Sequence, residues 1–156
     1  MITKIIAFDQ STTKTGYCIM NYDTQEIIQS GVIKPKGDTN DRILKVVKKC
    51  LHLCSEHQPS FVFVEGVQYQ NNSRVLEILA KLAGTLELCL IEKGYYVNVV
   101  KASEWRSRVG IKGGKRHGLK QQAIDMVKDL YDLNAPEDEC EAILFARAFT
   151  KGNNNK

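Results

Sequence analysis

Acidic side chains occupy several positions where a metal-dependent reaction centre could form. Asp9 and Glu65 each follow a short apolar stretch typical of a buried strand. In the acidic segment 137–141, Asp138 and Glu141 are three residues apart, which places both on one face of a helix. Carboxylates that converge from separate elements are the oxygen ligands that paired Mg²⁺ ions use to hydrolyse a phosphodiester. One interpretation of these four residues is therefore a site of this kind.

The same acids have a simpler interpretation. Aspartate is common in the turns that follow strands, so Asp9 alone indicates little. Acidic residues in the first turn of a helix stabilise the positive end of the helix dipole, and segment 137–141 fits that role. The residue types alone leave both interpretations open.

Basic residues concentrate in one segment of the chain. Segment 101–120 has seven Lys or Arg residues and one acid, a local charge of 7 − 1 = +6, against +4 for the whole protein. The seven are Lys101, Arg106, Arg108, Lys112, Lys115, Arg116 and Lys120. Four glycines in the same segment allow the backbone to approach a phosphate closely. A solvated face is the ordinary explanation of such charge, but the glycines favour binding of a polyanion such as nucleic acid.

The spacing of apolar residues predicts how these side chains are positioned. Strands are expected at 2–8, 17–21, 25–33, 61–64 and 95–100, and helices around 43–54 and at 73–93, 103–109, 119–131 and 136–150. A three-stranded meander followed by alternating helices and strands predicts one α/β domain over 1–150, with a mixed sheet covered by helices on both faces. Asp9 and Glu65 are then expected to be neighbours at strand ends. Residues 151–156 are expected to be a disordered tail.

Other features exclude some classes of protein. No apolar run reaches the roughly 20 residues that a membrane-spanning helix needs. The five cysteines are odd in number and lack zinc-type spacing, so reduced thiols in a cytoplasmic protein are expected.

Several segments, in order along the chain, resemble motifs of the RuvC-type Holliday junction resolvases, a group within the RNase H-like superfamily. Segment 6–17 resembles their opening strand, Asp, turn and Gly-Tyr, and segment 63–67 resembles their strand-four glutamate motif. Segment 138–144 is similar to their final helix, in which two acids three residues apart precede apolar residues. Segments 81–84 and 108–111 extend the similarity over nearly the whole chain. The resemblance implies an RNase H-like fold with a five-stranded sheet.

The resemblance also implies a catalytic set and its metal. By position, Asp9, Glu65, Asp138 and Glu141 would hold two ions, Mg²⁺ or Mn²⁺, and Lys120 would offset the negative charge that develops during cleavage. The chain departs from the family at Glu141, where the family usually has Asp. It also departs in the turn after Asp9, which reads Gln-Ser-Thr where the family has Pro-Gly-Ser.

DNA contacts are implied mainly in the basic segment. The candidates are Tyr69, Arg106, Arg108, Lys112, Lys115, Arg116 and Lys120. Tyr69 lies in a polar loop near the position where the family often carries an aromatic residue that inserts at the junction. Stacking on a base and simple packing both remain interpretations of this residue.

The long helix at 73–93 is apolar around most of its circumference, which is typical of a helix covered on two sides. The sheet would cover one side and a second subunit the other. A four-way junction has two-fold symmetry and paired nicks need two active sites, so a symmetric homodimer is expected.

Other functions compete with the resolution of junctions. An RNase H-like nuclease for RNA–DNA hybrids or flaps keeps the fold, and a non-catalytic branched-DNA-binding protein keeps the partner. Segment 9–16 also resembles the phosphate loop of sugar kinases and actin-like ATPases, but those proteins need a duplicated domain that 156 residues cannot provide. The short, divergent form predicts a phage origin, whereas a helicase partner and a preferred cleavage sequence cannot be predicted.

Overall fold

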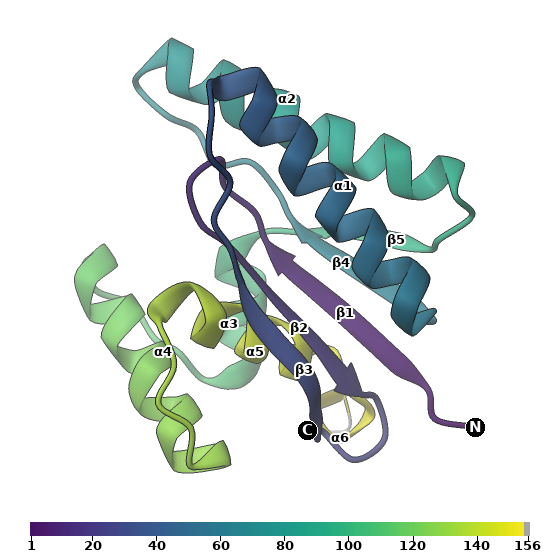
Figure 1. The fold of residues 1–156 in the computed structure, drawn as a ribbon. Coiled ribbons are helices and arrows are strands. Elements are labelled where there is room, and N and C mark those ends of the chain that lie inside the picture. The colour runs from purple at the N-terminus through teal and green to yellow at the C-terminus, as the bar shows by residue number, and fades with distance from the viewer. Residues whose placement is uncertain (155–156) are drawn as a thin grey trace.

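A five-stranded mixed sheet forms the centre of the protein (Figure 1). The computed structural model describes residues 1–154, without the side chains of Arg116 and Asn154. The strands are β1 (Lys4–Asp9), β2 (Thr15–Asn21), β3 (Ile27–Ile33), β4 (Phe61–Glu65) and β5 (Val97–Val100), in the order β3-β2-β1-β4-β5. The first three strands form an antiparallel meander, and β4 and β5 run parallel to β1. The predicted mixed sheet is confirmed.

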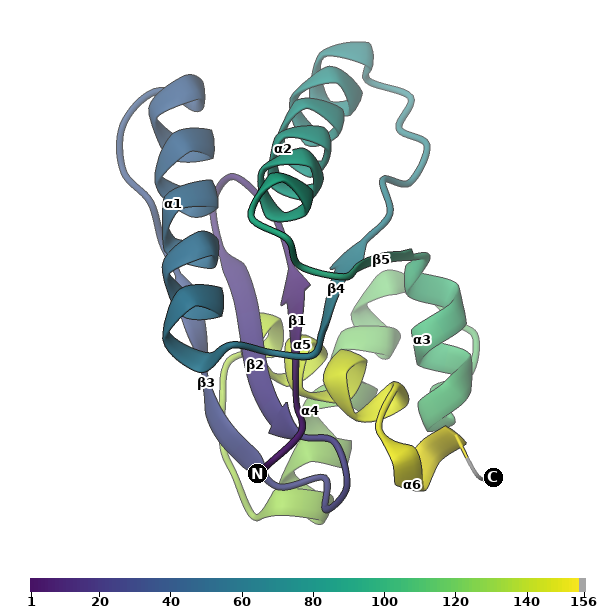
Figure 2. The same ribbon diagram turned by 90° about the vertical axis from the view of Figure 1, so that its right-hand side faces the viewer.

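Helices cover both faces of this sheet, as predicted (Figures 1 and 2). Helices α1 (Thr39–His57) and α2 (Ser73–Glu92) lie on one face, and α3 (Ala102–Val109), α4 (Arg116–Tyr131) and α5 (Glu137–Ala148) lie on the other. Side chains alternate along β1: Ile6 and Phe8 pack toward α1 and α2, whereas Ile5 and Ala7 pack toward α5. Because both faces are covered, β1 is apolar almost throughout.

Four strands end at the same edge of the sheet. Strands β4 and β5 are parallel to β1, and β3 has the same direction because each of the first three strands reverses the one before it. We call the edge where β1, β3, β4 and β5 end the carboxyl edge. Helices α1 and α2 also begin on this side of the molecule (Figures 1 and 2).

The end of the chain differs from the sequence-based expectation. Residues 151–154 form a short helix, α6 (Lys151–Asn154), and are not a disordered tail. The backbone N–H of Lys151 donates a hydrogen bond of 3.0 Å to the carbonyl oxygen of Tyr22, at the end of β2. Residues 155 and 156 lie outside the described part of the chain.

Some element boundaries also shift. Helix α4 begins at Arg116, three residues before its predicted start, and β5 begins at Val97, two residues after its predicted start. All five cysteines are free thiols, in agreement with the prediction. Over residues 1–154, no helix has the combination of length and apolar composition needed to cross a bilayer.

Candidate active site

The ends of β1 and β4 bring two of the predicted carboxylates together. Phe8 and Val64 are the last register partners of these adjacent strands, so Asp9 and Glu65 follow side by side. The side chain of Gln10 extends the pairing by one step. Its amide nitrogen donates to the carbonyl oxygen of Glu65 at 2.5 Å, and its amide oxygen accepts from the Glu65 backbone N–H at 3.1 Å. Gln10 thus fixes the backbone that carries both acids.

A tryptophan on α3 orients the side chain of Glu65. The indole N–H of Trp105 donates to Oε2 of Glu65 at 3.1 Å. The Trp105 ring is fully buried and stacks on Phe145 of α5, with 5.8 Å between the ring centres. Sequence reasoning missed both Gln10 and Trp105. A buried indole needs an acceptor, but the chain does not indicate which one.

Helix α5 brings the third and fourth carboxylates to the same place, and a glycine makes this possible. Gly16 on β2 is the register partner of Asp9. A Cβ atom at Gly16 would lie 1.9 Å from the carbonyl oxygen of Asp138, far inside the contact distance. The first turn of α5 therefore lies directly against β2, next to Asp9. Only glycine permits this approach.

The four acids perturb one another electrostatically. Burial raises the pKa of Asp9 well above its ordinary value, and the charges of Glu65, Glu141 and Asp138 raise it further. Burial also raises the pKa of Glu65, although the Trp105 hydrogen bond and the Arg106 charge oppose the shift. The pKa of Asp138 is raised by burial and by Glu137, against the charges of Lys120 and Lys14. The predicted set of four lines one cavity. Neighbouring like charges favour the uptake of a proton or a cation.

The side chain of Glu141 is the most clearly unsatisfied polar group of the cluster among the described residues. The residue is only 6% exposed, and its Oε1 atom is buried without a hydrogen-bond partner among the described residues. Oε2 of Glu141 faces Nη2 of Arg106 at 3.5 Å. A buried carboxylate oxygen without a partner is costly, so a proton shared with Asp9 or a bound cation would stabilise it.

The donor set fits a hard divalent ion. All four side chains offer carboxylate oxygens, the ligands that Mg²⁺ and Mn²⁺ prefer. Among the described residues, no three His, Cys, Asp or Glu side chains already form a metal-binding arrangement.

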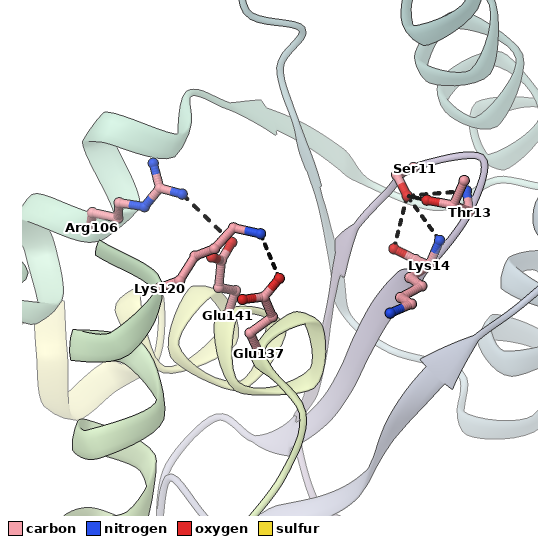
Figure 3. A network of polar contacts seen from close by, with 7 residues as sticks. All are labelled: Ser11, Thr13, Lys14, Arg106, Lys120, Glu137 and Glu141. Atoms are coloured by element: carbon pink, nitrogen blue, oxygen red, sulfur yellow. Dashed lines mark hydrogen bonds and ion pairs between the residues drawn. The ribbon is translucent and has the colours of Figure 1, made fainter. Parts of the chain in front are cut away.

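Two predicted basic residues reach the site, and each is paired with an acid of α5 (Figure 3). Nζ of Lys120 lies 2.5 Å from Oε1 of Glu137, and Arg106 pairs with Glu141. Glu137 and Glu141 are one helical turn apart, so one face of α5 holds both cations. Glu137 thus has a specific partner in addition to its position in the first turn of α5.

A cavity of about 540 Å³ contains the carboxylates and opens beside the turn that follows β1. The hydroxyl oxygen of Ser11 accepts hydrogen bonds from the backbone N–H groups of Thr13 and Lys14, and it donates to the Lys14 carbonyl oxygen (Figure 3). This network orders the turn without the glycine of the family motif. Lys14 lines the cavity as a result, a position that its sequence context did not indicate.

The remaining predicted DNA contacts lie outside the cavity. Tyr69 is 82% exposed in the loop between β4 and α2, which argues against simple packing. Lys112 and Lys115 are exposed between α3 and α4. Arg108 does not line the cavity; its guanidinium lies 4.5 Å from the centre of the Phe149 ring. The side chain of Arg116 lies outside the described part of the chain.

Comparison with known proteins identifies the family. The family model described as "Crossover junction endodeoxyribonuclease RuvC" matches residues 5–149, which is nearly the whole chain. The chain belongs to the RuvC family. This membership confirms the sequence-based resemblance and removes the basis for the ATPase alternative, and nucleases of the RuvC family are metal-dependent.

Individual relatives agree with this placement. A RuvC crossover junction endodeoxyribonuclease from a Sulfurovum species is 25% identical over 149 residues, covering 91% of each chain. That of Treponema denticola is 24% identical and covers 96% of this chain and 85% of its own. The fold is similar to that of T. thermophilus RuvC in complex with a Holliday junction substrate, with a TM-score of 0.76, 14% identity and coverage of 94% and 91% of the two chains. The RNase H-like fold of the RuvC family is therefore confirmed for this chain.

Proposed function

We propose that this protein is an endonuclease that resolves four-way (Holliday) or related branched DNA by paired nicks. The observation that carries the proposal is the cluster of Asp9, Glu65, Asp138 and Glu141 in a RuvC-family fold. One buried oxygen of Glu141 has no hydrogen-bond partner within residues 1–154. Family membership supports an endodeoxyribonuclease, and a structural relative has been solved with a Holliday junction substrate.

Each residue of the cavity has a role in this proposal. Asp9, Glu65, Asp138 and Glu141 would hold two Mg²⁺ or Mn²⁺ ions, which would supply an activated water and stabilise the leaving oxygen. Gln10 and Trp105 hold Glu65 in place through their hydrogen bonds. Lys120 offsets negative charge at the phosphate, because its ammonium group already lies beside the first turn of α5.

The surface around the cavity supplies contacts to DNA. Arg106 and Lys14 line the cavity and would meet the phosphate next to the cut. Exposed Lys112 and Lys115 would neutralise phosphates farther along the strand, without reading sequence. Exposed Tyr69 would stack on an unpaired base at the branch point.

A symmetric homodimer is part of the proposal, because α2 has an apolar face turned away from the sheet. Leu82 and Leu86 are fully buried against the core, whereas Leu88 is 66% exposed and Ile91 is 51% exposed. Gly84 lies on the same outer face, with open space around its Cβ position. Leu88→Glu should give a folded monomer by sedimentation. A wild-type monomer that makes paired nicks would contradict this part of the proposal.

The function is tested by comparing cleavage of a synthetic four-way junction, a flap, a linear duplex and an RNA–DNA hybrid, each with Mg²⁺, with Mn²⁺ and with EDTA. We expect paired nicks in the junction only when a metal is present, and none from Asp9→Asn. Preferred cleavage of the hybrid would identify a nuclease of another substrate class. Tight junction binding without any metal-dependent cut would identify a non-catalytic binding protein.

A further inference from the structure

A second group of basic residues lies outside segment 101–120. Segment 34–49 contains six Lys or Arg residues and two Asp residues, a net charge of 6 − 2 = +4. The six are Lys34, Lys36, Arg42, Lys45, Lys48 and Lys49, which we call the α1 basic surface. The positive charge of the chain is therefore concentrated in two segments, 34–49 and 101–120. Acids in the rest of the sequence reduce the net charge of the whole protein to +4.

In the described part of the chain, the α1 basic surface differs from Arg106 and Lys120 because none of its six cations has an ion-pair partner. Arg42 donates to the carbonyl oxygen of Gly37 at 2.8 Å, and Lys45 donates to that of Lys36 at 2.5 Å, which holds the loop before α1 against the helix. Arg106 and Lys120, in contrast, are already paired with acids of the protein.

The position of this surface relates it to the active site. Strand β3 ends at the carboxyl edge and leads directly into the loop that carries Lys34 and Lys36 (Figures 1 and 2). A groove of about 380 Å³ lies between the start of α1 and the first half of α2. Its lining includes the cations Arg74 and Lys81 and the acids Asp38 and Glu77. The loop that carries Lys34 and Lys36 thus begins at the edge that holds the catalytic cavity, and the other four cations follow along α1.

We infer that the α1 basic surface binds the sugar–phosphate backbone of a duplex arm as it leaves the active site. The inference rests on the proposed function, because it requires branched DNA in the cavity. Unpaired lysines can exchange water for phosphate without first breaking an ion pair, and each contact releases counterions from the DNA. This surface contributes affinity that is independent of sequence and grows with arm length.

The test compares two triple variants that remove the same charge. Lys34→Gln/Lys36→Gln/Lys49→Gln changes ammonium groups that make no hydrogen bond among the described residues. The control is Lys4→Gln/Lys93→Gln/Lys151→Gln, whose positions lie at the start of β1, the end of α2 and in α6, away from the carboxyl edge. Junction affinity is measured against salt concentration in EDTA, with arms of about 20 base pairs (roughly 70 Å) and about 6 base pairs (roughly 20 Å).

For junctions with long arms, the first variant should reduce the slope of log binding constant against log salt concentration by up to about 2.7, which is three phosphate contacts at about 0.9 each. The control should change this slope little. The loss should be smaller with short arms, and the nicking rate at saturating junction should equal that of wild type. The inference would be overturned by equal salt-dependence slopes for the two variants, or by a loss of affinity that is the same for both arm lengths. A wild-type protein that neither binds nor nicks junctions would instead refute the proposed function.

Discussion

The two halves of the active site are held in different ways. Asp9 and Glu65 sit at the ends of paired strands, and hydrogen bonds from Gln10 and Trp105 fix the strand-borne half. Asp138 and Glu141 sit on α5, where the helix-borne half depends on the close contact at Gly16 and on an ion pair with Arg106. Hydrogen bonds to a buried backbone are directional, whereas an ion pair tolerates changes in geometry.

This difference indicates which half adapts when an ion binds. The strand-borne acids have little freedom, because the sheet and the Gln10 amide fix their backbone. Glu141 has a longer side chain than the usual Asp of the family. One of its oxygens has no hydrogen-bond partner among the residues that the structure describes, and the other faces Arg106. The helix-borne half is therefore the part expected to move toward the metal.

The largest effect is expected from breaking the strand-borne half at its centre. Asp9→Asn keeps the shape of the side chain but removes the charge that interacts with all three other acids. Nicking of a four-way junction should fall by at least about 1,000-fold, at the upper end of the cost of losing one electrostatic group in a catalytic centre. Junction binding in EDTA should remain. Cleavage within about 10-fold of wild type would show that Asp9 is not a metal ligand.

The same variant should make the metal-free protein more stable at neutral pH. Because the folded-state pKa of Asp9 is raised, the folded protein holds a proton that the unfolded chain has lost, so wild-type stability falls as pH rises from about 4 through that raised pKa. Asp9→Asn removes this penalty; a gain of 1 kcal/mol would raise Tm by about 2–4 °C in a domain of this size. The advantage should vanish below about pH 4, where both states are protonated.

A smaller but still large effect is expected in the helix-borne half. Glu141→Gln should leave folding intact and cut nicking by about 100-fold, the scale of loss when contacts at a metal site are removed. Junction binding in EDTA should be equal or tighter, because Arg106 loses its acidic partner and becomes available to phosphate. A dead Glu137→Gln enzyme beside a fully active Glu141→Gln enzyme would mean that the fourth ligand is misassigned.

Removing the two hydrogen bonds between the Gln10 side chain and the Glu65 backbone should have an intermediate effect on nicking. Gln10→Ala deletes both hydrogen bonds to the Glu65 backbone, each worth about 1 kcal/mol, and leaves all four acids in place. We expect nicking to fall by about 10-fold and the metal concentration for half-maximal rate to rise. Gln70→Ala is the matched control, since Gln70 also lines the cavity but forms no hydrogen bond to Glu65 among the described residues. Equal behaviour of the two variants would remove Gln10 from the site.

The smallest effect is expected at Glu137. Glu137→Gln weakens the partly exposed ion pair with Lys120, and such pairs contribute about 0–1 kcal/mol, or at most about 5-fold in rate. Lys120→Met should cost more than Glu137→Gln, because the ammonium group acts on the phosphate and its partner only positions it. The reverse order in single-turnover nicking rates would make Glu137 the more important group.

Much of the fold could be predicted from short apolar stretches bounded by turns. The stretches ending at Asp9 and Glu65 are buried on both sides, so their apolar composition identified them as central strands. Topology then placed their ends together. The segment 151–154 was mispredicted because Lys, Gly and Asn give no local helix signal, and its anchor is the distant Tyr22 carbonyl.

Contacts within the site were harder to predict. The acids are recognisable by type and spacing, but their partners come from elsewhere in the chain: Gln10 pairs with Glu65, and Lys120 pairs with Glu137. Charge counting along the sequence has the same limit. It emphasised segment 101–120, where Arg106, Arg108 and Lys120 form ion pairs in the fold. It overlooked segment 34–49, where no cation forms an ion pair with a described residue.

Helix α5 completes the site from near the far end of the sequence, and this has a consequence for synthesis. Asp9 and Glu65 leave the ribosome first, and Asp138 and Glu141 follow only after every strand of the sheet has been made. A chain that has emerged only as far as its last strand lacks two of the four candidate ligands. If these residues act as proposed, a chain that lacks α5 is not expected to cut the DNA around it.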